Sequence, residues 1–148
     1  MDLFLWRHAD SLSGVSDFER ELSKQGHQQA SKTASWFREH ADPASLRILA
    51  SPSVRTRQTI AHFCEDESRI ELCMPLYDNA PVEEILDILG WPDIASATLV
   101  VGHQPQIGFL ADYLLGDTPH PDSFKKCALW WLRLAPGRAE LVKVIEMI

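Results

Sequence analysis

Cysteine is scarce in this sequence of 148 residues, basic residues are outnumbered, and long hydrophobic runs are missing. The three cysteines are odd in number and match no metal-binding or disulfide spacing, so we expect free thiols in a reducing compartment. Only 14 Lys and Arg residues stand against 21 Asp and Glu residues, giving a net charge of −7. That balance disfavours nucleic acid and anionic membranes as partners, although a few converging arginines could still bind phosphate.

The apolar segments are too short for targeting or membrane insertion. The stretch from Leu3 to Trp6 does not reach the length of a signal-peptide core, and no segment approaches a membrane-spanning helix. No repeat, low-complexity segment or linker interrupts the chain. We therefore expect a cytoplasmic protein with one domain over residues 1–148, long enough to bury a hydrophobic core.

Short β-prone runs alternate with amphipathic segments along the chain. The pattern predicts strands over 2–7, 46–50, 70–74 and 98–101, helices over 24–40, 51–66 and 81–89, a fourth helix ending before Gly116, and a C-terminal hairpin of 127–134 and 140–146. Alternating strands and helices are typical of a parallel sheet with helices on both faces. We predict an α/β fold, a three-layer α/β/α sandwich with a mostly parallel sheet and an antiparallel C-terminal hairpin.

Polar side chains follow three of the predicted strands. Arg7-His8 ends the first strand, Ser51 to Arg55 follows the second, and Gly102-His103 ends the fourth. In such sheets ligands bind beyond the carboxyl ends of the strands. Each short motif alone occurs by chance in unrelated proteins. Their placement at matching strand ends, however, predicts that two imidazoles and two guanidiniums meet at one edge.

The combined pattern resembles the histidine phosphatase (phosphoglycerate mutase-like) superfamily. The motifs that carry the resemblance are Arg7-His8, Arg20 before Leu22-Ser23-Lys24-Gln25-Gly26, the run Ser51-Pro52-Ser53-Val54-Arg55-Thr56-Arg57-Gln58-Thr59, and Gly102-His103. Ala9 stands where many members have Gly. Within the superfamily the chain is similar to SixA-type phosphohistidine phosphatases, in its small size, its Arg-His-Ala-acid start and its ending from Phe124 to Leu129.

The resemblance implies a phosphatase that works through a covalent intermediate on His8. Arg7, Arg20 and Arg55 would bind the phosphoryl oxygens, and His103 would add a further donor. Water would then hydrolyse phospho-His8. We expect no metal or cofactor to be required, since the arginines neutralise the developing charge.

The source of a general acid is left open. The interval from Pro52 to Gly102 is too short for the lid insertion that usually brings a protonating Glu in larger relatives, so we expect a shallow, open pocket. Asp10, Asp78 and Glu83 are candidate acids, each more typical of a solvated charge. Because an imidazole leaving group needs protonation less than an alkoxide, the interpretation favours phosphohistidine on a partner protein, such as a histidine phosphotransfer domain.

Two alternatives stay open. One is a phosphatase for a small phosphoester, with Asp78 or Glu83 as the acid, and the other is an inactive phosphoprotein-binding module on the same fold. The other histidines, namely His27, His40, His62 and His120, and Arg57 are expected to have no catalytic role.

Overall fold

A six-stranded sheet forms the centre of the computed structural model, which describes residues 1–116 and 124–146. Its strands are β1 (Asp2–Arg7), β2 (Arg47–Ala50), β3 (Ile70–Leu72), β4 (Thr98–Gly102), β5 (Leu129–Ala135) and β6 (Arg138–Ile145). The strand order is β3-β2-β4-β1-β5-β6, in which β3, β2, β4 and β1 are parallel and the β5–β6 hairpin is antiparallel. The predicted mixed sheet is confirmed.

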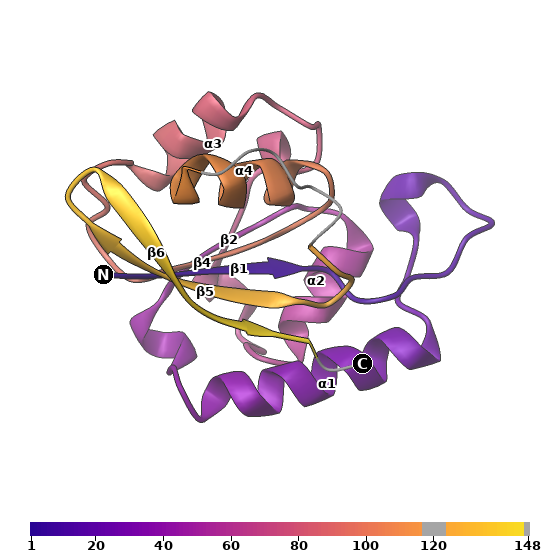
Figure 1. The fold of residues 1–148 in the computed structure, drawn as a ribbon. Helices are drawn as coiled ribbons and strands as arrows, with labels where there is room; N and C mark the ends of the chain where they lie inside the picture. The colour runs from indigo at the N-terminus through magenta and orange to yellow at the C-terminus, as the bar shows by residue number, and fades with distance from the viewer. Residues whose placement is uncertain (117–123, 147–148) are drawn as a thin grey trace.

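Helices cover both faces of the sheet (Figure 1). They are α1 (Lys24–Arg38), α2 (Val54–Ala61), α3 (Val82–Leu89) and α4 (Gln106–Leu115), with short 3₁₀ turns η1 (Asp17–Glu19), η2 (Pro43–Ser45), η3 (Glu67–Arg69) and η4 (Met74–Leu76). Helices α1 and α2 share one hydrophobic core with the sheet, while α3 and α4 share the core on the other face. The three-layer sandwich is therefore also confirmed.

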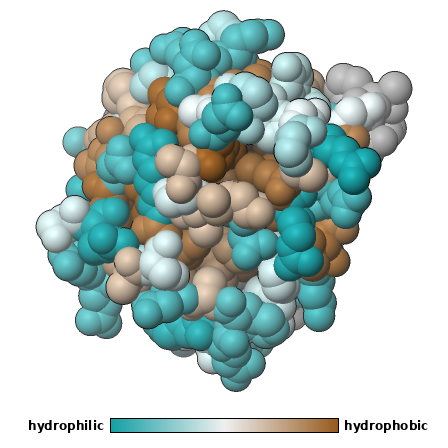
Figure 2. Space-filling view, turned by 90° about the vertical axis from the view of Figure 1, so that its left-hand side faces the viewer, coloured by the Kyte–Doolittle hydropathy of each residue, from teal (hydrophilic) through white to brown (hydrophobic). Residues whose placement is uncertain are grey.

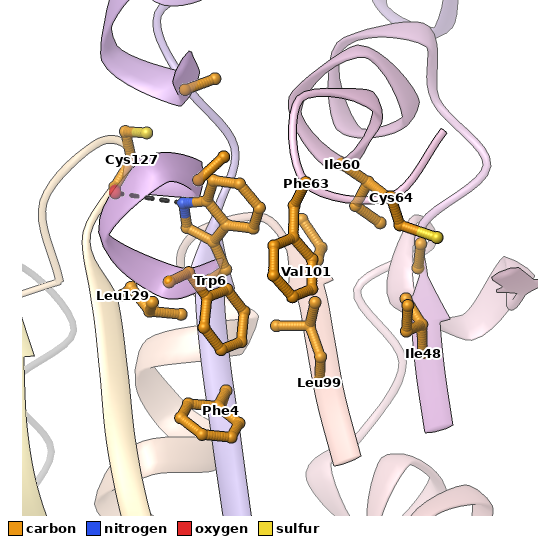
Figure 3. Close-up of a cluster of buried hydrophobic side chains, with 14 of the residues drawn as sticks. Phe4, Trp6, Ile48, Ile60, Phe63, Cys64, Leu99, Val101, Cys127 and Leu129 are labelled. Atoms are coloured by element: carbon orange, nitrogen blue, oxygen red, sulfur yellow. Dashed lines mark hydrogen bonds between the residues drawn. The ribbon is translucent and has the colours of Figure 1, made fainter. Parts of the chain in front are cut away.

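Strand β1 shows why the sheet is buried on both sides. Phe4 and Trp6 point to the α1–α2 core, whereas Leu3 and Leu5 point to the α3–α4 core, since successive side chains of a strand alternate. The indole Nε1 of Trp6 donates a hydrogen bond of 3.2 Å to the carbonyl oxygen of Cys127 (Figure 3). That bond satisfies the one polar atom of a side chain that is otherwise fully packed.

Helix limits differ from the predictions in three helices, of which α3 differs least, starting at Val82 instead of residue 81. Helix α1 starts as expected, with the Ser23 hydroxyl accepting from the Gly26 amide, but it ends at Arg38 instead of residue 40. Helix α2 starts at Val54 and ends at Ala61 instead of covering 51–66. The amide of Phe63 bonds to the Ile60 carbonyl three residues earlier, a tightened turn that closes α2.

Figure 2 views the end of the molecule at which the N-terminus lies, opposite the carboxyl ends of the parallel strands. Hydrophilic residues form much of the rim of this face, and hydrophobic residues gather nearer its centre. None of the helices formed by the described residues combines the length and apolar character needed to cross a membrane.

Candidate active site at the carboxyl ends of β1, β2 and β4

The sheet register brings the predicted histidines together. The amide of His8, just after β1, donates to the carbonyl of Gly102 at the end of β4 over 3.1 Å. The amide of Ser51, just after β2, donates to Val101 over 3.1 Å. The rings of His8 and His103 consequently lie with centroids 5.0 Å apart at an angle of 58°.

Arg55, in the first turn of α2, joins the two imidazoles. Its Nε lies 3.4 Å from Nε2 of His8, and its Nη2 lies 3.2 Å from Nδ1 of His103. A guanidinium only donates hydrogen bonds, so both ring nitrogens are acceptors in this arrangement. Arg55 is only 6% exposed, and its charge therefore acts on the two rings with little solvent screening.

The surroundings of His8 leave its Nε2 unprotonated. Its Nδ1 lies 2.7 Å from the carbonyl oxygen of Ala9, which can only accept, so the ring proton is assigned to Nδ1. Burial, followed by the neighbouring His103, lowers the pKa of His8 to about 3. A neutral imidazole with an unprotonated Nε2 is the form required of a nucleophile.

His103 is held by hydroxyl groups. Its Nε2 lies 2.7 Å from Ser51 Oγ and 3.3 Å from both Ser53 Oγ and Thr56 Oγ1. Burial, followed by the Arg55 charge, lowers the pKa of His103 to about 4. Since Nδ1 accepts from Arg55, this ring donates to a phosphoryl oxygen from Nδ1 only after it gains a proton.

The other two predicted arginines make no hydrogen bond to either imidazole among the described residues, although the charge of each acts on His103. Arg7 donates from Nη1 to the carbonyl of Phe124 over 2.8 Å, and its buried Nε has no hydrogen-bond partner among the described residues. Such an unpaired donor is costly, and an anionic oxygen would satisfy it. Arg20 donates to Leu12 O and to Asp17 Oδ1, so it reaches Arg55 through Asp17.

None of the three candidate acids makes a hydrogen bond to either imidazole among the described residues. Asp10 accepts from the Ser23 hydroxyl at 2.6 Å and from Lys126 Nζ at 3.0 Å, and these contacts, Ser23 first, lower its pKa. Asp78 and Glu83 are exposed side chains. Asp10 is therefore a carboxylate at neutral pH.

Several motif residues act by holding the loops of the site. A Cβ on Gly26 would lie 1.9 Å from the carbonyl oxygen of Asp10, so only glycine allows α1 to approach the chain just after His8. Thr59 Oγ1 accepts from the Ala9 amide at 3.1 Å, and Gln58 Oε1 accepts from the Leu22 amide at 2.8 Å. These contacts explain the spacing of the motifs.

Two residues at the site were not predicted. Asp17, in η1, accepts from Arg55, and Tyr77, directly after η4, donates to Asp17 and packs its ring 5.8 Å from that of His103. Both lie in irregular segments without a periodic pattern. An acid three residues before Arg20 is the only sequence signal that could have drawn attention to Asp17.

The remaining histidines lie elsewhere or outside the described part. His27 and His62 contact each other on α1 and at the end of α2, a pairing that we did not predict. His120 lies outside the described residues. Arg57 is exposed, as expected. Among residues 1–116 and 124–146, no three His, Cys, Asp or Glu side chains are grouped to hold a metal ion.

The chain belongs to the histidine phosphatase superfamily, since residues 3–76 match branch 1 of that family. An uncharacterised protein of Mycobacterium tuberculosis is 36% identical over 107 residues, which cover 71% of this chain and 66% of that protein. The matched region thus spans just under two thirds of the length of that relative.

Solved structures extend the likeness over nearly the whole chain. The protein histidine phosphatase SixA, complexed with tungstate, has a TM-score of 0.85 and 26% identity over 99% of this chain and 97% of that chain. A candidate SixA phosphohistidine phosphatase from Nakamurella multipartitia has a TM-score of 0.77 and 29% identity over 98% and 95% of the two chains. Family and fold together support a phosphatase.

Proposed function

We propose that this phosphatase removes the phosphoryl group from phosphohistidine on a partner protein through a phospho-His8 intermediate. The observation that carries the proposal is the state of His8. Its Nδ1 proton is bound to Ala9 O, and its Nε2 lone pair lies 3.4 Å from the Nε of Arg55. The unprotonated nitrogen of a nucleophile and a donor of a phosphate-binding group thus lie next to each other.

The transfer begins with Nε2 of His8 forming a bond to phosphorus. The bond from phosphorus to the substrate nitrogen breaks, and the electron pair leaves with the substrate imidazole. Arg7, Arg20 and Arg55 are proposed to bind the equatorial oxygens, to which Arg supplies several donors in a plane. His103 becomes a donor to the same oxygens once a bound dianion favours its protonation. Water then breaks the bond from phosphorus to His8 and releases phosphate.

The substrate class follows from the groups around the site. An alkoxide leaving group benefits from a nearby acid, whereas an imidazole leaving group is less basic and can carry its own ring proton. Asp10 is held as a carboxylate, and Asp78 and Glu83 have exposed side chains. The likeness to the protein histidine phosphatase SixA points to the same substrate.

The test is a side-by-side steady-state comparison at one pH. A phosphorylated histidine phosphotransfer domain is expected to give a kcat/KM roughly 10²-fold higher than p-nitrophenyl phosphate or a sugar phosphate. The His8→Ala variant serves as the blank, and added EDTA is expected to change neither rate. A small phosphoester as the better substrate would contradict the proposed substrate class and favour the alternative of a small-molecule phosphatase.

A further inference from the structure

The turn η1 brings a carboxylate against the guanidinium of the candidate site. Arg55 donates from Nη1 to the main-chain oxygen of Asp17 over 2.6 Å and from Nη2 to Asp17 Oδ2 over 3.2 Å. The hydroxyl of Tyr77 donates to the same Oδ2 over 2.9 Å, and Arg20 Nη1 lies 3.3 Å from Oδ1. Three segments distant in sequence therefore meet on one aspartate.

These contacts divide the guanidinium into two edges. The outer edge, formed by Nη1 and Nη2, is held by Asp17. The inner edge, formed by Nε and Nη2, faces Nε2 of His8 at 3.4 Å and Nδ1 of His103 at 3.2 Å. Because a guanidinium is a rigid planar fork, fixing the outer edge also fixes the direction of the inner edge.

Asp17 also offsets the charge of a nearly buried guanidinium. The side chain of Asp17 is 55% exposed and that of Arg55 is 7% exposed, so loss of Asp17 would leave a buried charge with one partner fewer. Kinetic measurements are therefore needed to separate positioning of Arg55 from stabilisation of the fold. The Tyr77 hydroxyl, with the Arg55 charge adding to it, lowers the pKa of Asp17, so the group stays an acceptor at neutral pH and is no proton donor.

We infer that Asp17 is a positioning residue, which holds Arg55 so that its Nε and Nη2 donors are directed at a phosphoryl group on His8. The inference rests on the proposed function, because it assumes that Arg55 stabilises the transferring group. It goes beyond that function by assigning a task to the η1 turn and to Tyr77. In the alternative role, Asp17 blocks Arg55 until the substrate displaces it. Removal of Asp17 would then tighten orthovanadate binding instead of weakening it.

The first experiment compares kcat and KM on a phosphorylated histidine phosphotransfer domain for D17A, D17N and E19A. D17A is expected to lower kcat about 10-fold, as when a catalytic group is displaced, and to weaken inhibition by orthovanadate. D17N keeps an acceptor oxygen for Arg55 and should recover most of the lost kcat. E19A removes an equal charge from the same exposed turn and should behave as the unmodified protein.

The second experiment repeats D17A in an R55K background. A lysine has no fork to orient, so the loss caused by D17A should shrink to less than about 2-fold there. A full additive loss in that background, or D17N as slow as D17A, would overturn the positioning role. Unchanged kcat with tighter orthovanadate binding in D17A would assign the blocking role instead.

The H8A variant distinguishes failure of the proposed function from failure of the positioning role of Asp17. If H8A keeps its rate, the proposed phospho-His8 mechanism is wrong. If H8A is inactive while D17A is normal, only the positioning inference fails.

Discussion

Two histidine pairs in this protein have nearly the same ring geometry and different surroundings. The rings of His8 and His103 are 5.0 Å apart at 58°, and those of His27 and His62 are 5.2 Å apart at 59°. The first pair is buried, with Arg55 donating to both rings. The second pair bonds to itself, Nδ1 to Nε2 at 2.9 Å, with His27 exposed at the surface.

The difference shows that two close imidazoles do not make a catalytic site. In the surface pair, one nitrogen of each ring bonds to the other ring, and Arg38 donates to the backbone oxygen of His62 instead of a ring nitrogen. In the buried pair, the guanidinium donates to both rings and fixes which nitrogen of each is unprotonated. Burial and a charged donor, rather than proximity, separate the candidate site from the surface pair.

The largest expected difference between the pairs is in turnover. His8→Ala should lower the rate about 10³-fold or more, because the nucleophile is lost. His62→Ala should leave the rate unchanged. Circular dichroism on both variants checks that each is folded, and comparable losses in the two variants would remove the distinction between the pairs.

The next largest difference is expected in kcat between variants of Arg55, beside the buried pair, and Arg38, beside the surface pair. Arg55→Ala is expected to cost on the order of 10²-fold in kcat, as for other preorganised charge-stabilising groups, and Arg55→Lys should restore only part of it. Arg38→Ala removes a donor beside the surface pair and should cost nothing in kcat. Steady-state kinetics with orthovanadate as a competitive inhibitor measures both effects, and a full rescue by lysine would argue against the role of the guanidinium fork.

The buried pair should also make stability depend on pH. With folded-state pKa values of about 3 and about 4, His8 and His103 stay neutral while the unfolded chain takes up protons below about pH 6.5. The unfolded state then binds more protons, so the free energy of unfolding rises with pH between these limits, by about 1.4 kcal/mol per unit and histidine. The contribution of the two neutral histidines to the free energy of unfolding is therefore fully present above pH 6.5 and is lost as the pH falls towards 4.

Urea unfolding at several pH values tests this expectation. His8→Asn keeps an amide donor for Ala9 O and has no titrating ring, so its stability should fall less between pH 6.5 and 4.5 than that of the unmodified protein. His62→Asn is the matched surface change. Equal slopes for the unmodified protein and His8→Asn would show that His8 titrates normally in the folded state.

The smallest expected difference is in the free energy of unfolding, between variants of the adjacent residues Gly26 and His27 on α1. Gly26 faces the chain after His8, where an added Cβ would lie 1.9 Å from Asp10 O, whereas His27 belongs to the surface pair. Gly26→Ala should lower the free energy of unfolding by about 1–3 kcal/mol through overpacking, even though alanine favours helix. His27→Ala should change it by less than about 0.5 kcal/mol. Chemical denaturation of the two variants measures the difference.

Local signals explain what could be predicted from sequence. Strand β1 has the same limits in the prediction and in the structure, because its apolar run is followed at once by Arg7 and His8. The meeting of His8, Arg55 and His103 could be predicted because parallel strands place their carboxyl ends at one edge of the sheet. Motifs that directly follow such strands therefore lie close together.

Long-range contacts explain what could not be predicted. Asp17 bonds to Tyr77 across a sequence separation of 60 residues, and His27 bonds to His62 across 35. Neither contact follows from a helical or strand period. The early end of α2 likewise depends on a tightened last turn and the burial of Phe63, not on a breaking residue.

Trapping of the phosphoenzyme tests the central claim most directly. The protein is mixed with a phosphorylated histidine phosphotransfer domain, quenched without acid, digested and analysed for phosphorylated peptides. The account predicts one acid-labile phosphoryl group on His8, present in Arg55→Lys and absent in His8→Ala. A phosphoryl group on another residue, or rapid turnover with no label on His8 at any quench time, would contradict it.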